Sequence, residues 1–229
     1  MGKACVLLLT LLLSCSGLGA QQSHRMTVAA GGGPNNMPAV AANVPFPVTA
    51  VSDTDGNLYF TTLFPRVFRV APSGQLTVFA GNGTFNYSGD GGSALKAAFL
   101  QPLGLALDND GNLYVTDIHG FVRRIDARTG TISTVAGGGP LGYLGDGGPA
   151  RNANLRGADN VAIGPDGDLY ISETINARVR RVDAVSRLIT TVAGNGITGF
   201  GGDGGLAVHA SLRQPAGIAL ARLGPLYLA

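Results

Sequence analysis

The sequence predicts an all-β protein built from one repeated unit, and two observations predict it. A five-residue signature of the form Asp-Gly-Asn/Asp-Leu-Tyr begins at Asp55, Asp110 and Asp166, and a degraded copy begins at Leu223, so the steps are 55, 56 and 57 residues. The composition suits short strands and tight turns, because glycine occurs 36 times, lysine twice and glutamate once in 229 residues. Residues that favour surface helices are scarce, and glycine is abundant where turns need a positive φ angle.

Two further motifs recur with the same period and indicate that the whole unit is repeated. Phe79-Ala80-Gly81 returns as residues 135–137 and 192–194, and Gly89-Asp90-Gly91-Gly92 returns as residues 145–148 and 202–205. Repeated units of this kind share one continuous core. We therefore expect one repeat domain over residues 21–229.

The second unit reads as four short strands, at residues 103–107, 113–116, 122–125 and 131–135. Turn-forming residues separate them, most clearly in the segment 108–112, so the unit is an antiparallel meander. The first two strands are apolar on both faces, which indicates sheets that are covered on both sides by their neighbours. Four-stranded antiparallel sheets stacked around an axis form a β-propeller. The predicted fold class is therefore an all-β propeller with four-stranded blades.

The repeat boundaries predict an incomplete ring of three blades plus a partial fourth. The blades are expected at about residues 47–80, 102–136, 158–193 and 215–229, with single helical turns near 93–98, 149–154 and 206–211. Residues 27–29 match the end of a fourth strand and are expected to form a lone outer strand. Open blade faces, with Leu58 and Phe60 on the first, would favour self-association. The alternative is a short chain that closes its ring by association.

The first 20 residues predict an export signal. Lys3 supplies a positive start, residues 6–13 are apolar, and small residues at 17–20 provide a cleavage site before Gln21. The apolar run is too short for a membrane span, which needs about 20 apolar residues. Residues 12–15 weakly resemble a lipoprotein signal, but the leucine before Ser14 disfavours a lipid anchor at Cys15. We expect the protein to be secreted, periplasmic or at the cell surface.

A resemblance to a known family rests on the combined motifs. The pattern Pro-x-Gly-[Leu/Ile]-Ala, Gly-Asn-Leu-Tyr, x-Arg-Val-Arg-Arg-Val and Thr-Thr-Val-Ala-Gly resembles the NHL-repeat propellers, and the Gly-Asp-Gly-Gly loop is similar to that of exported bacterial members. The third unit keeps the signature best, in residues 173–179. Glu173 stands where the family has Asp, the second unit has Asp117, and the first has Thr62. The resemblance implies a propeller that binds protein, RNA or carbohydrate, with a few members that are enzymes.

The most regular polar residues are Asp90, Asp146 and Asp203, one in each Gly-Asp-Gly-Gly loop. A ring of these carboxylates would bind cations or ligand, whereas an Asx-turn or helix N-cap would be structural. A residue that recurs in every blade usually serves the blade, so we interpret these three as structural loop residues.

Five residues are predicted ligand contacts on the face that carries the long inter-blade loops. Asp159 and Asn160 break the repeat pattern at the start of an innermost strand, beside the central channel, and a turn specific to this repeat is the alternative interpretation. Asp117, Glu173 and Asn176 begin or lie in the loops between second and third strands, which the up-down strand order places on the same face.

Other polar groups receive structural interpretations. Residues 108–112 superficially resemble a calcium loop, but the spacing fails the EF-hand pattern and predicts a β-turn. The pairs Arg123/Arg124 and Arg180/Arg181 are interpreted as solvated strand edges, because Asp126 and Asp183 follow them. The histidines His24, His119 and His209 show no metal-binding spacing, and no catalytic residue, metal or cofactor is predicted.

The sequence is compatible with three functions. The leading hypothesis is an exported, non-catalytic scaffold that binds a protein or a glycan through loops on one face. The alternative is a metal-dependent lyase or lactonase whose site is completed by blades outside this sequence. RNA binding is the third, but a net charge of +2 and the export signal argue against a nucleic-acid partner.

Overall fold

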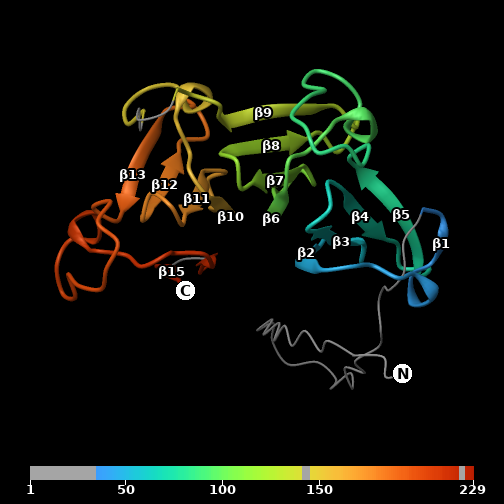
Figure 1. The fold of residues 1–229 in the computed structure, drawn as a ribbon, viewed down its shortest axis with the longest axis horizontal. Coiled ribbons are helices and arrows are strands. Elements are labelled where there is room, and N and C mark those ends of the chain that lie inside the picture. Colours follow the sequence, from blue (N-terminus) through green and yellow to red (C-terminus); the bar gives the residue numbers. More distant parts are fainter. Residues whose placement is uncertain (1–34, 141–144, 222–224) are drawn as a thin grey trace.

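The computed structural model describes residues 35–140, 145–221 and 225–229, and it confirms the predicted fold class (Figure 1). The described strands form a five-stranded, two four-stranded and one two-stranded antiparallel sheet. The sheets follow one another around an arc, with β2, β6 and β10 toward its centre and β5, β9 and β13 on its rim (Figure 1). The predicted export signal and the lone strand at 27–29 lie outside the described residues.

The strand bounds show how each unit becomes one blade. The first sheet contains β2 (Pro47–Ser52), β3 (Leu58–Thr62), β4 (Val67–Val70) and β5 (Gln75–Ala80). The second contains β6 (Pro102–Leu107), β7 (Leu113–Asp117), β8 (Phe121–Ile125) and β9 (Ile132–Gly137). The third contains β10 (Ala158–Ile163), β11 (Leu169–Glu173), β12 (Arg178–Val182) and β13 (Ile189–Ala193), and the fourth contains β14 (Ile218–Leu220) and β15 (Leu226–Leu228).

Within the described residues, helical structure is confined to single 3-10 turns, and three of the four lie where the sequence predicted them. They are η1 (Ala39–Ala41), η2 (Ala94–Lys96), η3 (Ala150–Asn152) and η4 (Ala207–His209). No helix in the described part of the chain is long and apolar enough to cross a bilayer.

The first sheet has a fifth strand that the sequence did not predict. β1 (Met37–Pro38) pairs antiparallel with β5, and Met37 lies opposite Leu76. The segment that follows covers the outer face of this sheet, where Ala39 and Ala42 pack against Phe60 and Phe68. The expectation that Phe60 is uncovered is therefore wrong, since only 3% of this residue is exposed.

The core lies between neighbouring sheets, which explains why the inner strands are apolar on both faces. Tyr59 and Val67 of the first sheet share a buried cluster with Leu105 and Val115 of the second. A second cluster joins the second and third sheets. Every residue of β7 is buried, because this strand has a neighbouring sheet on each side.

A buried hydroxyl joins each blade to the next at the inner strands. The hydroxyls of Thr61, Thr116 and Ser172 donate to carbonyl oxygens of the following sheet, at Leu103 (2.6 Å), Asp159 (2.9 Å) and Ala216 (2.9 Å). Each hydroxyl also accepts a backbone N–H of its own innermost strand, from Thr49, Gly104 and Asn160 respectively. The innermost strands bulge at this point, so the hydroxyl satisfies an N–H that the ladder leaves unpaired.

The inter-blade loops run along the outer strand of the following sheet. Gly91 donates to the carbonyl of Ile132 (2.8 Å), and Ile132 donates to the carbonyl of Gly92 (2.9 Å). Each loop starts at a glycine with positive φ, such as Gly137 (φ 92°), where a Cβ atom would collide with the backbone of Gly120. The inter-blade loops and the buried hydroxyls together join neighbouring blades, and the predicted contacts lie on the face that these loops form.

Candidate functional site

Two of the three Gly-Asp-Gly-Gly aspartates, Asp90 and Asp146, bind buried arginines of the following blade. Asp90 accepts a hydrogen bond from Arg123 (2.7 Å) and one from the backbone of Thr134 (2.9 Å), and Asp146 pairs with Arg180. Burial raises the pKa of Asp90, but the bonds from Arg123 and Thr134 outweigh it and leave this pKa below its ordinary value. Of the two structural roles considered, an Asx-turn or a helix N-cap, the N-cap is not formed, because the 3-10 turns that follow the three loops, η2, η3 and η4, have no side-chain cap. Asp203 lies in an exposed turn before η4.

The interpretation of Arg123 and Arg180 as solvated edges is also wrong. Their side chains are 1% and 0% exposed, because they reach back under the inter-blade loop toward the aspartates. Their neighbours Arg124 and Arg181 are partly exposed and pair with Asp126 and with Asp168 and Asp183.

Sequence reasoning missed this aspartate–arginine pair, although the repeats carry a signal for it. The first unit has Asn35 where the others have the aspartate, and Phe68 where the others have the arginine. Asn35 still accepts the backbone N–H of Val78 (2.8 Å), as Asp90 does from Thr134. The acid and the base are thus replaced together.

Asp117 and Glu173 lie beneath the loop face. Asp117 accepts the backbone N–H groups of Leu100 (2.8 Å) and Gln101 (3.0 Å). Glu173 is 0% exposed and accepts from the backbone of Arg156 (2.9 Å), from Arg180 (3.1 Å) and from Asn176. Burial raises the pKa of Glu173 above its ordinary value, and these bonds offset only part of that effect. Both carboxylates accept backbone N–H groups at the ends of loops, and the side chain of Asn176 donates a hydrogen bond to the Glu173 carboxylate.

Asp159 and Asn160 lie at the inner edge of the third sheet, as predicted. Asn160 accepts the N–H of Val161 (2.9 Å) through its own side chain, and its main chain closely approaches Gly104 of the second sheet. Asp159 is partly exposed. Burial raises the pKa of its carboxyl group, and the hydroxyl of Thr174 offsets part of the rise.

Two hollows open on the loop face. One, of about 250 Å³, lies between loops of the second and third sheets and is lined by Ile118, His119, Phe121, Asn154, Arg156 and Ile175, among others. The other, of about 300 Å³, lies on the first sheet and is lined by Pro45, Thr62, Phe64, Pro65, Arg66, Phe68 and Gly83.

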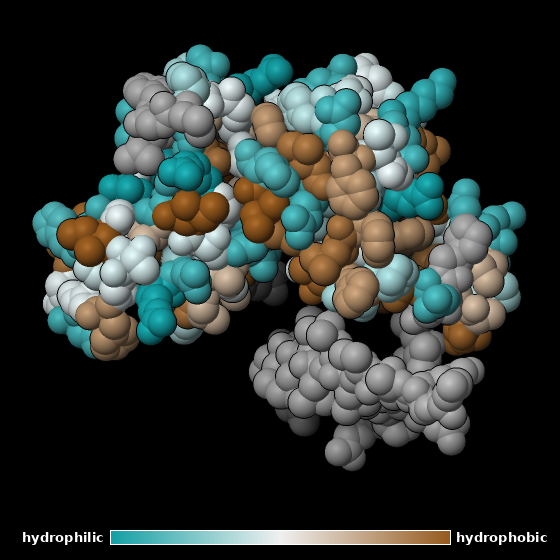
Figure 2. All heavy atoms as spheres, in the orientation of Figure 1, coloured by the Kyte–Doolittle hydropathy of each residue, from teal (hydrophilic) through white to brown (hydrophobic). Residues whose placement is uncertain are grey.

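Exposed aromatic rings stand beside the hollow on the first sheet. Phe85 is 60% exposed, and its ring centroid is 6.4 Å from that of Phe64, which lines the hollow; Phe46, which follows the lining residue Pro45 in the chain, is 66% exposed. On the face visible in Figure 2, hydrophobic side chains gather over the first and second sheets more than over the third. Exposing such rings to water is unfavourable in the free protein, and clusters of them are typical of binding surfaces.

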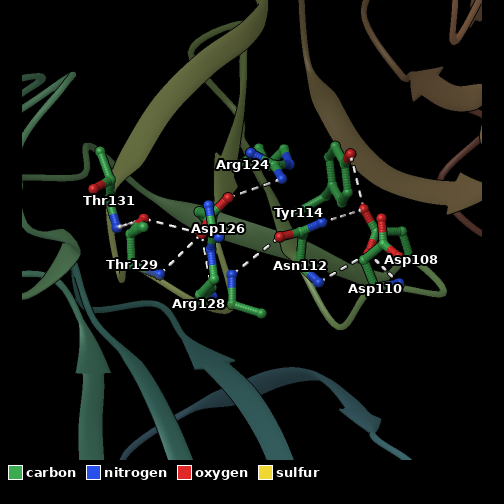
Figure 3. Close-up of polar contacts among 10 residues, drawn as sticks. Asp108, Asp110, Asn112, Tyr114, Arg124, Asp126, Arg128, Thr129 and Thr131 are labelled. Carbon is green, nitrogen blue, oxygen red and sulfur yellow. Dashed lines mark hydrogen bonds and ion pairs between the residues drawn. The ribbon is translucent and has the colours of Figure 1, made fainter.

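Two turns on the opposite face are held by hydrogen bonds to their own acidic side chains (Figure 3). The Asp108 carboxylate accepts from Asn112 (main chain 2.9 Å, side chain 2.8 Å) and from Tyr114 (3.2 Å), as expected for a β-turn built around an acid. The Asp126 carboxylate similarly accepts from Thr129 and Arg124. Within residues 35–140, 145–221 and 225–229, no three His, Cys, Asp or Glu side chains are grouped to hold a metal ion.

Comparisons with known proteins agree on the fold. No family model matches the chain. The Arabidopsis thaliana chloroplastic protein SUPPRESSOR OF QUENCHING 1 is 31% identical over 164 residues, which are 68% of this chain and 15% of that protein. A solved Bacteroides thetaiotaomicron protein of unknown function is 19% identical with a TM-score of 0.62, covering 78% of this chain and 43% of that one.

A solved Bacteroides ovatus auxiliary nutrient binding protein is 20% identical with a TM-score of 0.54, covering 78% of this chain and 44% of that one. These structural neighbours are β-propeller-like proteins. The chain spans less than half the length of each of these three proteins.

Proposed function

We propose that this chain is part of an exported propeller that binds a glycan through its loop face without chemical turnover. The observation that carries the proposal is the hollow on the first sheet, which is lined by the rings of Phe64 and Phe68, with the exposed ring of Phe85 in contact with Phe64. Ligand sites are typically concave, mostly apolar and furnished with few polar groups. The polarised C–H groups of a sugar ring are attracted to the negative face of an aromatic ring.

The fates of the predicted contact residues support binding over catalysis. Asp117 and Glu173 are occupied with backbone and arginine donors, so they serve the scaffold. Asp159 is partly exposed on an innermost strand, and His119 is exposed and lines the hollow of about 250 Å³; we propose both as additional contacts. The name of the Bacteroides ovatus neighbour, a nutrient binding protein, also supports a binding role for this fold.

The test is retention of the purified chain on an array of immobilised neutral and acidic polysaccharides. We expect binding to at least one polysaccharide, and loss of it in Phe64→Ala and Phe85→Ala. Phe200→Ala is the matched control, because Phe200 is 89% exposed on a loop away from the hollow. Retention on no polysaccharide, or equal retention of all variants, contradicts the proposal. Release of shortened or unsaturated sugars would favour the lyase alternative.

A further inference from the structure

Arg66 lies in the hollow on the first sheet and has no internal partner. Within the described residues its side chain forms no ion pair and no hydrogen bond, and its Nε atom is buried without a partner. Its guanidinium lies against Gly83, where a Cβ atom would approach within 2.8 Å. A guanidinium presents five N–H donors, and because Arg66 is half-buried and only its Nε atom is fully buried, its terminal N–H groups are accessible to a ligand.

The same repeat position in the third unit shows what a satisfied arginine looks like. Arg178 donates to the carbonyls of Asn195 (2.9 Å) and Asn176 (3.5 Å), and it lies against Gly196 as Arg66 lies against Gly83. The packing of an arginine against a glycine is therefore repeated, but the guanidinium donors of Arg66 remain available whereas those of Arg178 are used.

The first unit has also lost the acid that the other loops contain. Asp117 and Glu173 begin the corresponding loops of the second and third sheets, and the first sheet has Thr62 there. The Thr62 hydroxyl is occupied by its own loop, where it accepts from the backbone of Phe64 (3.2 Å). Pro45 stands where Leu100 donates one of the two backbone N–H groups that Asp117 accepts, so one of the two donors has disappeared together with the acid. A cation remains in a hollow that no carboxylate lines.

We propose that Arg66 binds the carboxylate of an acidic sugar residue, a hexuronate, in this hollow. The inference rests on the proposed glycan-binding function and names its ligand class. A carboxylate matches the guanidinium fork through two parallel hydrogen bonds. Prolines and the rings of Phe64 and Phe68 form the other walls, which suits the apolar face of a sugar ring. A volume of about 300 Å³ is at the small end of ligand pockets and accommodates a single ring residue.

The experiment is calorimetric titration of the full chain with three probes. They are tri-galacturonate, the same trisaccharide with its carboxylates methyl-esterified, and free galacturonate. We expect the acidic trisaccharide to bind more than tenfold tighter than its neutral ester, and this preference to shrink as salt rises. Tighter binding of the trisaccharide than of free galacturonate would identify the ligand as a residue within a glycan, and equal binding would identify a free sugar acid.

Variants attribute the preference to the guanidinium. Arg66→Gln should abolish the acid preference while retaining the affinity for the neutral ester, and Arg66→Lys should keep only part of it because the fork is lost. Arg128→Gln, at an exposed arginine on the opposite face, should leave all affinities unchanged. An unaltered acid preference in Arg66→Gln overturns the inference.

The two proposals fail in different ways. Equal binding of acidic and neutral trisaccharides by the original chain overturns the hexuronate site and leaves glycan binding standing. Retention on no polysaccharide of the array overturns both.

Discussion

At the scale of single residues, the first unit replaces both members of the aspartate–arginine pair that the next two units contain. Arg123 is buried between the rings of Tyr87 and Phe99, with its carbon Cζ 5.1 and 5.2 Å from their centroids, and it pairs with Asp90. In the first unit the same positions hold Phe68 and Asn35. We expect the cation and its acid to be replaceable by an aromatic ring and an amide, provided that both change.

This exchange predicts strong coupling between Asp90 and Arg123. Asp90→Asn alone should lower the free energy of unfolding by about 2 kcal/mol, because it leaves a buried guanidinium without its anion while the acid itself was partly exposed. Arg123→Phe alone should cost a similar amount through lost hydrogen bonds. The double variant should recover about 1–2 kcal/mol of the summed cost, since it recreates the first unit's combination. Urea unfolding measures the cycle, and additive costs would contradict the coupling.

A second residue-scale prediction concerns pH. The pKa of Glu173 is raised by burial above the value of 4.5 that it has when unfolded, so the folded state holds the proton more tightly. Stability from this group is complete below pH 4.5 and declines as the pH rises toward the folded pKa. We expect the decline to vanish in Glu173→Gln, measured by urea unfolding between pH 4 and 8. A variant with the same pH profile as the original chain would contradict the assignment.

At the scale of elements, turns and strands could be predicted because their signals are local. The β-turn at residues 108–112 and the strands around it follow from turn residues and apolar runs. β1 could not be predicted, because two residues such as Met37 and Pro38 carry no strand pattern, and their pairing depends on the edge that β5 presents. The hydrogen bonds of Asp117 and Glu173 could not be predicted either, because the sequence pattern of an acidic loop residue is the same whether its side chain points outward or beneath the loop.

The hydroxyls of the second strands predict how neighbouring blades are joined. Thr116→Val keeps the shape of the side chain but removes the donor to Asp159 and the acceptor for Gly104, both in buried surroundings. We expect a loss of about 1–3 kcal/mol in the free energy of unfolding. Thr84→Val, at an exposed loop position, is the control and should change stability little. Hydrogen exchange should show reduced protection at the Gly104 amide. Unchanged protection there would contradict the role of the Thr116 hydroxyl in joining the two blades.

At the scale of the whole molecule, the sheets differ in how well their neighbours cover them. The second sheet is covered on both faces, and the first has the segment of residues 37–44 over its outer face. The fourth sheet has two strands, and their residues are at most partly buried. Among the described residues β15 pairs with β14 alone, so one of its edges presents unpaired backbone groups.

This edge predicts self-association of the purified chain. Unpaired strand edges with exposed apolar neighbours recruit further strands, and Tyr227 on β15 is 59% exposed. We expect light scattering to show a mass that rises with concentration. Tyr227→Lys should suppress the rise, because a charge on an edge strand blocks pairing with a second copy. Phe200→Lys introduces the same charge at a more exposed ring outside any strand, so it should leave the association in place. A constant monomer mass for the original chain, or equal suppression by both variants, would show that β15 is not the associating edge.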